Sequence, residues 1–330
     1  MPAVMTQAQR DAISMIAGYG KCMTAKLKAS GRGEQNAEMM LVSRTDGVLT
    51  IEDYGGWANR HAALSRMLRE LDAAGALPDF APVLLQTGDR CVVRRAADGG
   101  AELHLWQRQP VPDELRARIA LARVLSMCGS PKYADVAVPD WCFEEWVEAG
   151  VPPGEFDAAC AALAAAAAAP PTDGRACWRG TAHHHPSRMR LVELAAEMPE
   201  LLACNAVVDS AGSAAAGHAP LQAQVAAYSA MLDLQGKGYS SRLKLLLHAG
   251  RPVLLVARPW REHFMDGLRE WVHYIPVREN LADLPERLRW LDEHRDEAAA
   301  IGRAGQAFAR ERLTRSAALE GLADAIRRLP

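Results

Sequence analysis

The segment DLQGKGYSSRLKLLLHAGRPVLL, residues 233–255, concentrates groups that suit an anion in one loop ahead of an apolar run. Gly236 and Gly238 allow a ligand to approach the backbone closely, and a serine of the YSS triplet can cap the helix that follows. The cations Arg242 and Lys244 fall in the first turn of that helix, where they oppose the helix dipole unless an anion is bound. The spacing matches neither GxxxxGK[ST] nor GxGxxG, and alone it fits a capped structural helix equally well.

Two further segments place polar side chains where apolar strands end. Arg179 lies between Trp178 and Gly180 in CWRGT, and Asp89 follows the apolar stretch APVLLQ. Ligands of α/β proteins collect at the carboxyl edge of the sheet, so Arg179 is placed to reach a ligand and Asp89 to act as a general base. Capping of the next segment is the alternative role for Asp89. The consecutive histidines at 183–185 lack a partner motif, which favours a polar turn over a metal site.

The elements that must position these residues alternate between strands and helices along the chain. A hairpin is expected around Asp46-Gly47 because this dipeptide suits a two-residue turn. Strands are expected in APVLLQ, LHLWQ, PVLLVA and VHYIPV. Helices are expected in WANRHAALSRMLRELDAAG and near residues 6–18, 112–127, 155–169, 188–196, 220–232, 241–249, 283–312 and 315–328.

This alternation predicts two α/β domains with largely parallel sheets, and 330 residues exceed the usual size of one domain. Pro170-Pro171 end an alanine-rich helix, and PPTDGRA is the most linker-like segment of the chain. We therefore expect an N-terminal domain over 1–170 and a C-terminal domain over 171–314. A last helix over 315–330 can pack back on the N-terminal domain.

Composition excludes several classes of protein. A net charge of −2, without a basic stripe interleaved with aromatics, argues against nucleic-acid binding. The seven cysteines are scattered and odd in number, so neither a disulfide framework nor a zinc site is indicated. The sequence has no signal peptide and no membrane-spanning run, so we expect a cytoplasmic protein. Scattered basic residues near the start of the chain leave room for peripheral contact with a membrane.

Three motifs resemble one known family in order and content. They are WRGT…SRMRL, YSAMLDLQGKGYSSRLKLLLHAGRPVLLV and LREWVHYIPVRENLADLPERLRWLDEHRDEAAAIGRAGQAF. This pattern resembles glycosyltransferase family 90, which includes protein O-glucosyltransferases, capsule-associated xylosyltransferases and bacterial lipopolysaccharide-modifying transferases. The strong resemblance covers about residues 175–313, and earlier parts match thinly but in the same order.

The resemblance implies a GT-B fold of two Rossmann-like domains that face each other across a cleft, with the UDP-sugar donor held mainly by the C-terminal domain. It also implies an inverting transferase that needs neither metal nor cofactor. By position, Asp89 becomes the catalytic base, and Arg179 and Arg242 hold the donor diphosphate. The other donor-site residues expected on this basis are Gly180, Tyr228, Gly236, Gly238, Tyr239, Ser240, Ser241, Lys244 and His273.

The chain departs from the family pattern in ways that affect the expected acceptor and base. Gly88 replaces an arginine that usually precedes the base, which leaves Asp140 and Asp79 as alternative bases, and Ser229 replaces a common lysine. The absence of a secretory signal favours a cytoplasmic enzyme, at the inner face of the plasma membrane, that moves glucose or xylose to lipopolysaccharide or another surface polysaccharide. The alternatives are a nucleotide-sugar-binding scaffold that has lost catalysis and a GT-B epimerase.

Overall fold

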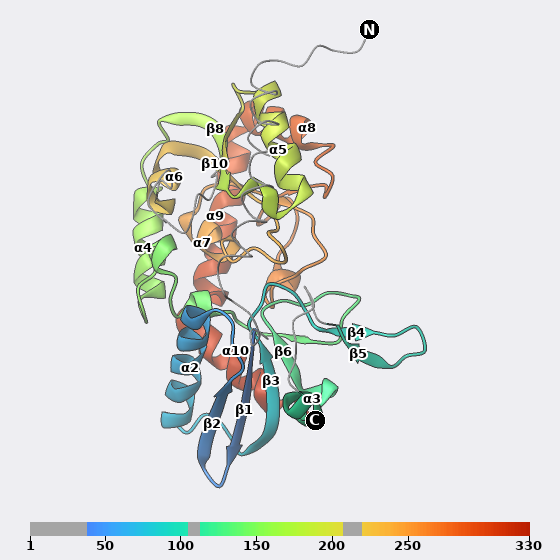
Figure 1. The fold of residues 1–330 in the computed structure, drawn as a ribbon. Helices are drawn as coiled ribbons and strands as arrows, with labels where there is room; N and C mark the ends of the chain where they lie inside the picture. Colours follow the sequence, from blue (N-terminus) through green and yellow to red (C-terminus); the bar gives the residue numbers. More distant parts are fainter. Residues whose placement is uncertain (1–37, 105–112, 207–219) are drawn as a thin grey trace, which may run out of the picture.

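A computed structural model describes residues 38–104, 113–206 and 220–330 as two α/β domains, one above the other in Figure 1. The helix expected at 6–18 lies outside these residues. The N-terminal domain is built on a five-stranded sheet of order β2-β1-β3-β6-β7. Its strands are β1 (Met39–Thr45), β2 (Val48–Asp53), β3 (Phe80–Gln86), β6 (Val124–Ser126) and β7 (Val136–Ala137).

The expected hairpin joins β1 and β2. Asp46 and Gly47 both have positive φ, 51° and 77°, as a type I′ turn requires. Strand β1 pairs antiparallel with β2 and with β3, whereas the pairs β3–β6 and β6–β7 are parallel, so β1 alone runs against the other four strands. The expectation of a largely parallel sheet is therefore wrong for the pairings of β1, because β1 lies between β2 and β3 and runs against both.

Helix α2 (Ala58–Ala73) buries the predicted face that contains Leu64, Met67, Leu68 and Leu71. The helix expected over 112–127 is wrong beyond residue 118: α3 (Asp113–Arg118) is short, and β6 follows it after a single turn. Val124 and Leu125 pair with Leu84 and Leu85 of β3, so sheet pairing overrides helical periodicity. A small hairpin, β4 (Val93–Arg95) and β5 (Ala101–Leu103), projects to the side in Figure 1.

The C-terminal domain has an all-parallel sheet of order β12-β11-β10-β8-β9. Its strands are β8 (Asp173–Gly180), β9 (Leu202–Ala206), β10 (Tyr228–Asp233), β11 (Val253–Val256) and β12 (Ile275–Val277). The helix expected over 220–232 is wrong in its second half, because α6 (Leu221–Ala227) ends where β10 begins. Numbered within the domain, the order is 5-4-3-1-2, so the chain reverses its direction of winding between β8 and β10.

Helices cover both faces of this sheet. The first group, α5 (Pro186–Glu197) and α8 (Leu284–Glu293), shares a core with alternate strand residues such as Trp178 and Leu232. The second comprises α4 (Phe156–Ala166), α6 and α7 (Leu243–Ala249). Helix α4 packs on α6 and α7 although it precedes the predicted boundary at residue 170.

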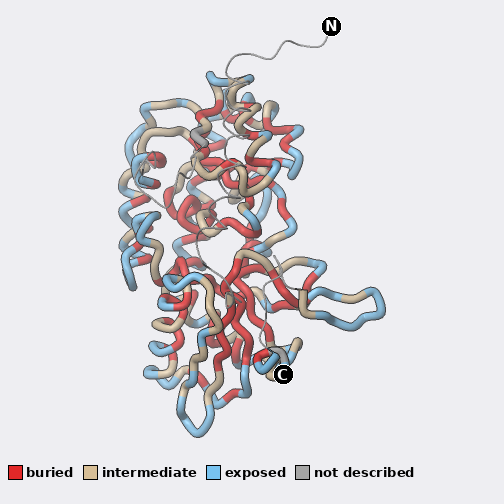
Figure 2. Tube along the Cα trace, in the orientation of Figure 1, coloured by how far each residue is buried: buried red, intermediate tan, exposed pale blue. Residues whose placement is uncertain are grey.

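The end of the chain returns to the first domain. Helix α9 (Arg295–Arg312) packs on α7 and α8, and α10 (Arg315–Arg327) contacts α2 and β3. Figure 2 shows buried residues along the strands of both sheets and where the domains meet. Within the described ranges, no helix combines the length and apolar character needed to cross a membrane.

Candidate functional site

The point where the winding reverses, between β8 and β10, brings two of the predicted segments together. Arg179 and Gly180 end β8, and the loop 234–242 connects β10 to α7 at the same carboxyl edge. The Arg242 guanidinium donates a hydrogen bond to the carbonyl of Arg179. Flavodoxin-like sheets bind their ligands at this position, so the topology supports a ligand site here.

Arg188, which the sequence analysis did not select, ties the two segments together. Its Nε donates to the Gln235 carbonyl at 2.7 Å, and its two Nη atoms donate to the carbonyls of Thr181 at 3.2 Å and Leu234 at 3.4 Å. The side chain comes from the first turn of α5 and is buried. The basic stretch SRMR directly after the histidines was the available signal.

Buried positive charge dominates the site. Burial lowers the pKa of the Arg242 guanidinium, and burial together with nearby Arg242 lowers the pKa of Arg188 to about 9. In the described part of the chain neither arginine has a carboxylate partner, and Nη2 of Arg242 has no hydrogen-bond partner. The buried carboxylate of Asp233 is already paired with Arg258 at 2.6 Å. A site with this surplus of desolvated cations favours a multiply charged anion.

Asp89 of the N-terminal domain meets this loop directly. Its carbonyl accepts a hydrogen bond from the Tyr239 N–H at 3.2 Å, and a Cβ added at Gly238 would overlap the same carbonyl oxygen. The Asp89 side chain remains 34% exposed. Nearby, Arg90 donates from Nε to the carbonyl of Lys237. The domains therefore place the candidate base and the cationic loop on opposite sides of one interface.

A guanidinium group does lie beside Asp89, although Gly88 replaces the arginine expected there. Arg60 of α2 donates from Nη1 to Oδ1 of Asp89 at 2.9 Å and to the Thr87 carbonyl at 2.8 Å. The Arg60 guanidinium lies between two tryptophan rings, 5.2 Å from the ring centre of Trp57 and 5.4 Å from that of Trp141. Its contribution was not visible in the sequence because 28 residues separate it from Gly88.

Neither alternative base faces the loop. Asp140 is buried, accepts a hydrogen bond from the Cys142 N–H at 3.2 Å and pairs with Lys244. Asp79 precedes β3 at the opposite end of the strand from Asp89, where it pairs with Arg44 at 2.7 Å. Of the three candidates, only Asp89 combines exposure with contact to the loop.

Lys244 does not point toward a ligand surface. Its side chain has 0% exposure, and Nζ lies 3.0 Å from Asp140 Oδ2 and 2.8 Å from Glu262 Oε1. It also donates to the Ser241 carbonyl at 3.0 Å. Burial raises the pKa of Glu262 to about 7, against the attraction of Lys244. Lys244 therefore joins the two domains through a buried ion cluster behind the loop, which corrects its placement among the donor-site residues.

Two other predicted residues lie at the opposite edge of the C-terminal sheet. Tyr228 begins β10 and pairs with Asp173 at the start of β8. His273 precedes β12, and its Nδ1 accepts a hydrogen bond from the Arg269 N–H at 3.1 Å. Both are therefore separated from the loop by the length of a strand, and the structure does not bring them into the site.

The remaining loop residues shape the site through buried contacts. Tyr239 is buried, and burial raises the pKa of its hydroxyl, which has no hydrogen-bond partner in the described part of the chain. The Ser240 hydroxyl donates to Asp233 at 2.6 Å, so it stabilises the loop rather than capping α7. At Gly236, an added Cβ would lie 3.5 Å from the Arg188 guanidinium.

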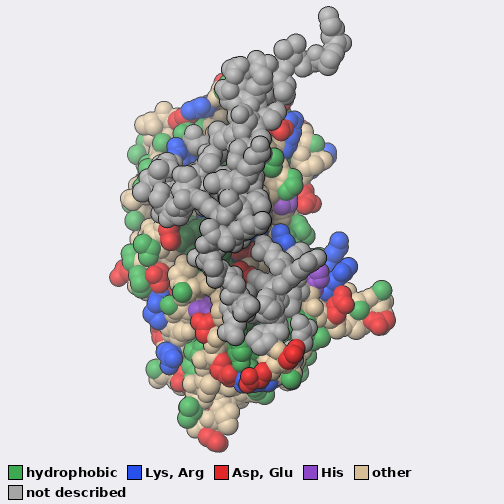
Figure 3. Space-filling model, viewed as in Figure 1, with side chains coloured by type: hydrophobic (Ala, Val, Ile, Leu, Met, Phe, Trp, Pro, Cys, Tyr) green, Lys and Arg blue, Asp and Glu red, His purple; other side chains and the backbone are tan. Residues whose placement is uncertain are grey.

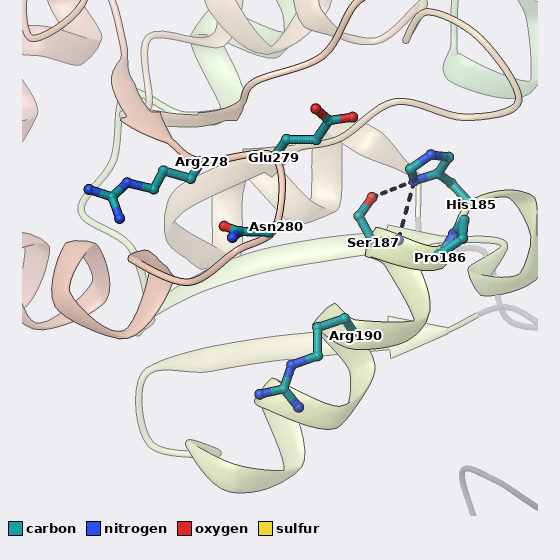
Figure 4. A pocket seen from close by; sticks show the side chains of 7 residues that line it. All are labelled: His185, Pro186, Ser187, Arg190, Arg278, Glu279 and Asn280. Carbon is teal, nitrogen blue, oxygen red and sulfur yellow. Dashed lines mark hydrogen bonds between the residues drawn. The ribbon is translucent and has the colours of Figure 1, made fainter.

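A pocket of about 600 Å³ adjoins the loop on the face covered by α5 and α8. Figure 4 shows His185, Ser187 and Arg190 on one side of it and Arg278, Glu279 and Asn280, from the segment after β12, on the other. His185 lies 2.9 Å from Nε2 of Gln235, which links the pocket to the loop. On the face of the molecule in Figure 3, acidic, basic and apolar side chains are interspersed over both domains.

A two-domain α/β chain with a cationic loop of the second domain facing a carboxylate of the first has the architecture of a GT-B glycosyltransferase. The sequence model for glycosyl transferase family 90 matches residues 58–319. The chain belongs to this family, which confirms the resemblance seen in its motifs.

Individual relatives match in part. Protein O-glucosyltransferase 2 of Danio rerio is 40% identical over 86 residues, which are 26% of this chain and 17% of the relative. Protein O-glucosyltransferase 1 of Rattus norvegicus is 28% identical over 233 residues, covering 66% of this chain and 58% of the relative. The chain thus spans less than two thirds of these relatives.

Solved structures show lower similarity. The crystal structure of HepE from Anabaena in complex with UDP-glucose has a TM-score of 0.32 and 15% identity, and the match covers 51% of this chain and 44% of HepE. A glycosyltransferase from Rickettsia africae has a TM-score of 0.33 and 10% identity, with coverage of 64% and 58%. The fold assignment therefore rests on the topology of this chain and on its family.

Proposed function

We propose that this protein is an inverting glycosyltransferase that moves a sugar from a UDP-sugar to a hydroxyl group of an acceptor. The observation that carries the proposal is the juxtaposition of Asp89 with the loop 234–242, next to buried Arg188 and half-buried Arg242, neither of which has a carboxylate partner among the described residues. A base and a group that neutralises a departing diphosphate are the two requirements of such a transfer.

In the proposed reaction, the Asp89 carboxylate takes the proton of the acceptor hydroxyl. The acceptor oxygen then forms a bond to the anomeric carbon of the donor sugar, and the bond from that carbon to the diphosphate oxygen breaks with its electron pair. Arg242, Arg179 and Arg188 stabilise the negative charge that accumulates on the departing UDP. Because guanidinium groups and loop N–H groups suffice for this charge, we propose that no metal is required.

The donor and acceptor are proposed from family membership. The names of the matched relatives identify them as O-glucosyltransferases, which supports glucose as the first donor sugar to test, with xylose as the second. For the acceptor we propose lipopolysaccharide or another surface polysaccharide precursor, modified in the cytoplasm at the inner face of the plasma membrane.

The test is release of the nucleoside diphosphate from a panel of UDP-, GDP- and TDP-sugars, with and without EDTA, by the wild type and by Asp89→Asn. We expect release from one UDP-sugar that EDTA does not reduce and that Asp89→Asn lowers at least about 100-fold. Full release by Asp89→Asn would remove Asp89 from the base position. UDP binding without any release, in the presence of a saccharide panel, would favour a binding protein that has lost catalysis.

A further inference from the structure

Trp57 is an exposed aromatic residue at the candidate base. It precedes α2 and is 47% exposed; Trp271, in the other domain, is 40% exposed. Arg60 connects Trp57 to the reaction centre, since its guanidinium lies 5.2 Å from the Trp57 ring centre and 2.9 Å from Asp89 Oδ1. Trp57 is therefore an exposed aromatic side chain that a single residue, Arg60, links to the candidate base.

The Trp57 ring is held in a defined orientation. Its Nε1 donates to Oε1 of Glu38 at 3.0 Å, which fixes the edge of the indole. The Arg60 guanidinium covers one face of the ring, backed in turn by Trp141. The exposed surface of Trp57 is therefore mainly its other face, a rigid apolar plane next to a carboxylate.

The backbone around Glu38 is arranged to bring this carboxylate close. The Glu38 carbonyl accepts hydrogen bonds from both the N–H and the hydroxyl of Thr87, each at 2.8 Å. Glu38 itself has a positive φ of 51°. A Cβ added at Gly56 would lie 2.9 Å from Glu38 Cα, and one added at Gly88 would overlap the Glu38 carboxylate. The departure from the family pattern at Gly88 thus makes room for the group that orients Trp57. A residue in the left-handed region, held from two sides, is typical of a functional site.

We infer that Trp57 and Glu38 form the acceptor subsite and that the acceptor is a glycan. A pyranose ring presents an apolar C–H face and polar hydroxyls at its edge, which match an indole plane bordered by a carboxylate. In this subsite the ring stacks on Trp57, one hydroxyl donates to Glu38, and another is directed toward Asp89. The inference rests on the proposed function, because it assigns the acceptor of that same reaction.

Binding is measured first, by calorimetric titration of the full chain, saturated with UDP, with trisaccharides of glucose, galactose and xylose. We expect at least one trisaccharide to bind and Trp57→Ala to weaken its binding at least about tenfold, with Trp57→Phe in between. Trp271→Ala is the matched control and leaves binding unchanged.

Kinetics provide a second readout. With UDP-glucose as donor, Trp57→Ala raises the KM for the saccharide by a larger factor than it lowers hydrolysis of the donor by water, because water does not use the subsite, while Trp271→Ala leaves both unchanged. Equal loss of hydrolysis and transfer would instead indicate a structural role and overturn the inference.

The outcomes separate this inference from the proposed function. Saccharide binding that depends on Trp57, in a protein that turns over no nucleotide sugar, would refute only the transferase proposal. Donor turnover without binding of any trisaccharide, or with binding that Trp57→Ala does not weaken, would refute only the glycan subsite. Transfer to a serine-containing peptide at wild-type rate by Trp57→Ala would identify a protein acceptor and likewise refute it.

Discussion

At the scale of single residues, the buried carboxylate of Glu262 makes the stability of the protein depend on pH. Its surroundings are Lys244 at 2.8 Å, Arg258 and Asp140, yet burial is the largest influence and raises its pKa to about 7 from the usual 4.5. Because the pKa of Glu262 is higher in the folded state than in the unfolded state, its contribution to stability is greatest below the pKa of the unfolded state. This contribution is lost as the pH rises through the pKa of the folded state. The relevant window is therefore about pH 4.5 to 7.

We predict that Glu262→Gln removes this loss. Relative to the variant, the wild type should lose on the order of 2 kcal/mol of unfolding free energy between pH 4.5 and 7.5. Urea denaturation of both proteins at half-unit pH intervals measures the difference in unfolding free energy. Taking the difference cancels the titration of nearby groups such as His263, because burial lowers the pKa of His263 to about 4 in both proteins. Glu286→Gln, an exposed control, should follow the wild type. Parallel curves for Glu262→Gln and the wild type would show that Glu262 is ionised throughout.

Some residues of the candidate site could be selected from the sequence and others could not. Arg179, Gly238 and Arg242 were identifiable because each belongs to a local motif next to a strand end. Tyr228, His273 and Lys244 carried chemistry of the right kind, but their orientation depends on strand direction and on packing between domains. Arg60 and Arg188 were missed because their roles arise only from tertiary contacts.

At the scale of elements, the loop 234–242 depends on a strand that the sequence did not reveal. Helical periodicity extended the expected helix to residue 232, whereas residues 228–233 form the central strand β10. Its neighbours β8 and β11 come from elsewhere in the chain, and helices cover both of its faces, so its residues lack the alternation of a half-exposed strand. The same reason accounts for β6, while the hairpin and α2 followed from local signals alone.

At Gly238 the loop packs directly against the N-terminal domain, and this contact can be tested. A Cβ there would overlap the backbone carbonyl of Asp89, which cannot move aside as a flexible side chain would. We predict that Gly238→Ala lowers the unfolding free energy by about 1–3 kcal/mol and reduces UDP release at least about tenfold.

Gly321→Ala is the control for this variant. Gly321 lies in α10, and an added Cβ would make an ordinary contact 3.4 Å from Pro139. Because alanine is the better helix former, this control should gain up to about 1 kcal/mol. If Gly238→Ala matched the wild type in both assays, the loop and Asp89 would not be in contact in solution.

At the scale of the whole molecule, each domain contributes one half of the proposed reaction centre. The ion cluster of Lys244, Asp140 and Glu262 and the return of α10 to α2 and β3 join the halves behind the site. The alternation of strands and helices predicted two α/β domains, but the order of strands within each sheet could not be predicted because it depends on pairing between distant segments.

The central claim is that the buried cations at the reversal between β8 and β10 are kept for an anionic donor. The most direct test is the unfolding free energy of the wild type and of Arg242→Met, each measured by denaturation without UDP and with UDP at about 100 times the wild-type Kd. An unpaired buried charge destabilises a fold, so without UDP the variant should be at least as stable as the wild type. UDP should stabilise the wild type by about 2.7 kcal/mol and the variant by less than about 1 kcal/mol. A variant that is destabilised without UDP, yet keeps the full stabilisation by UDP, would contradict the claim.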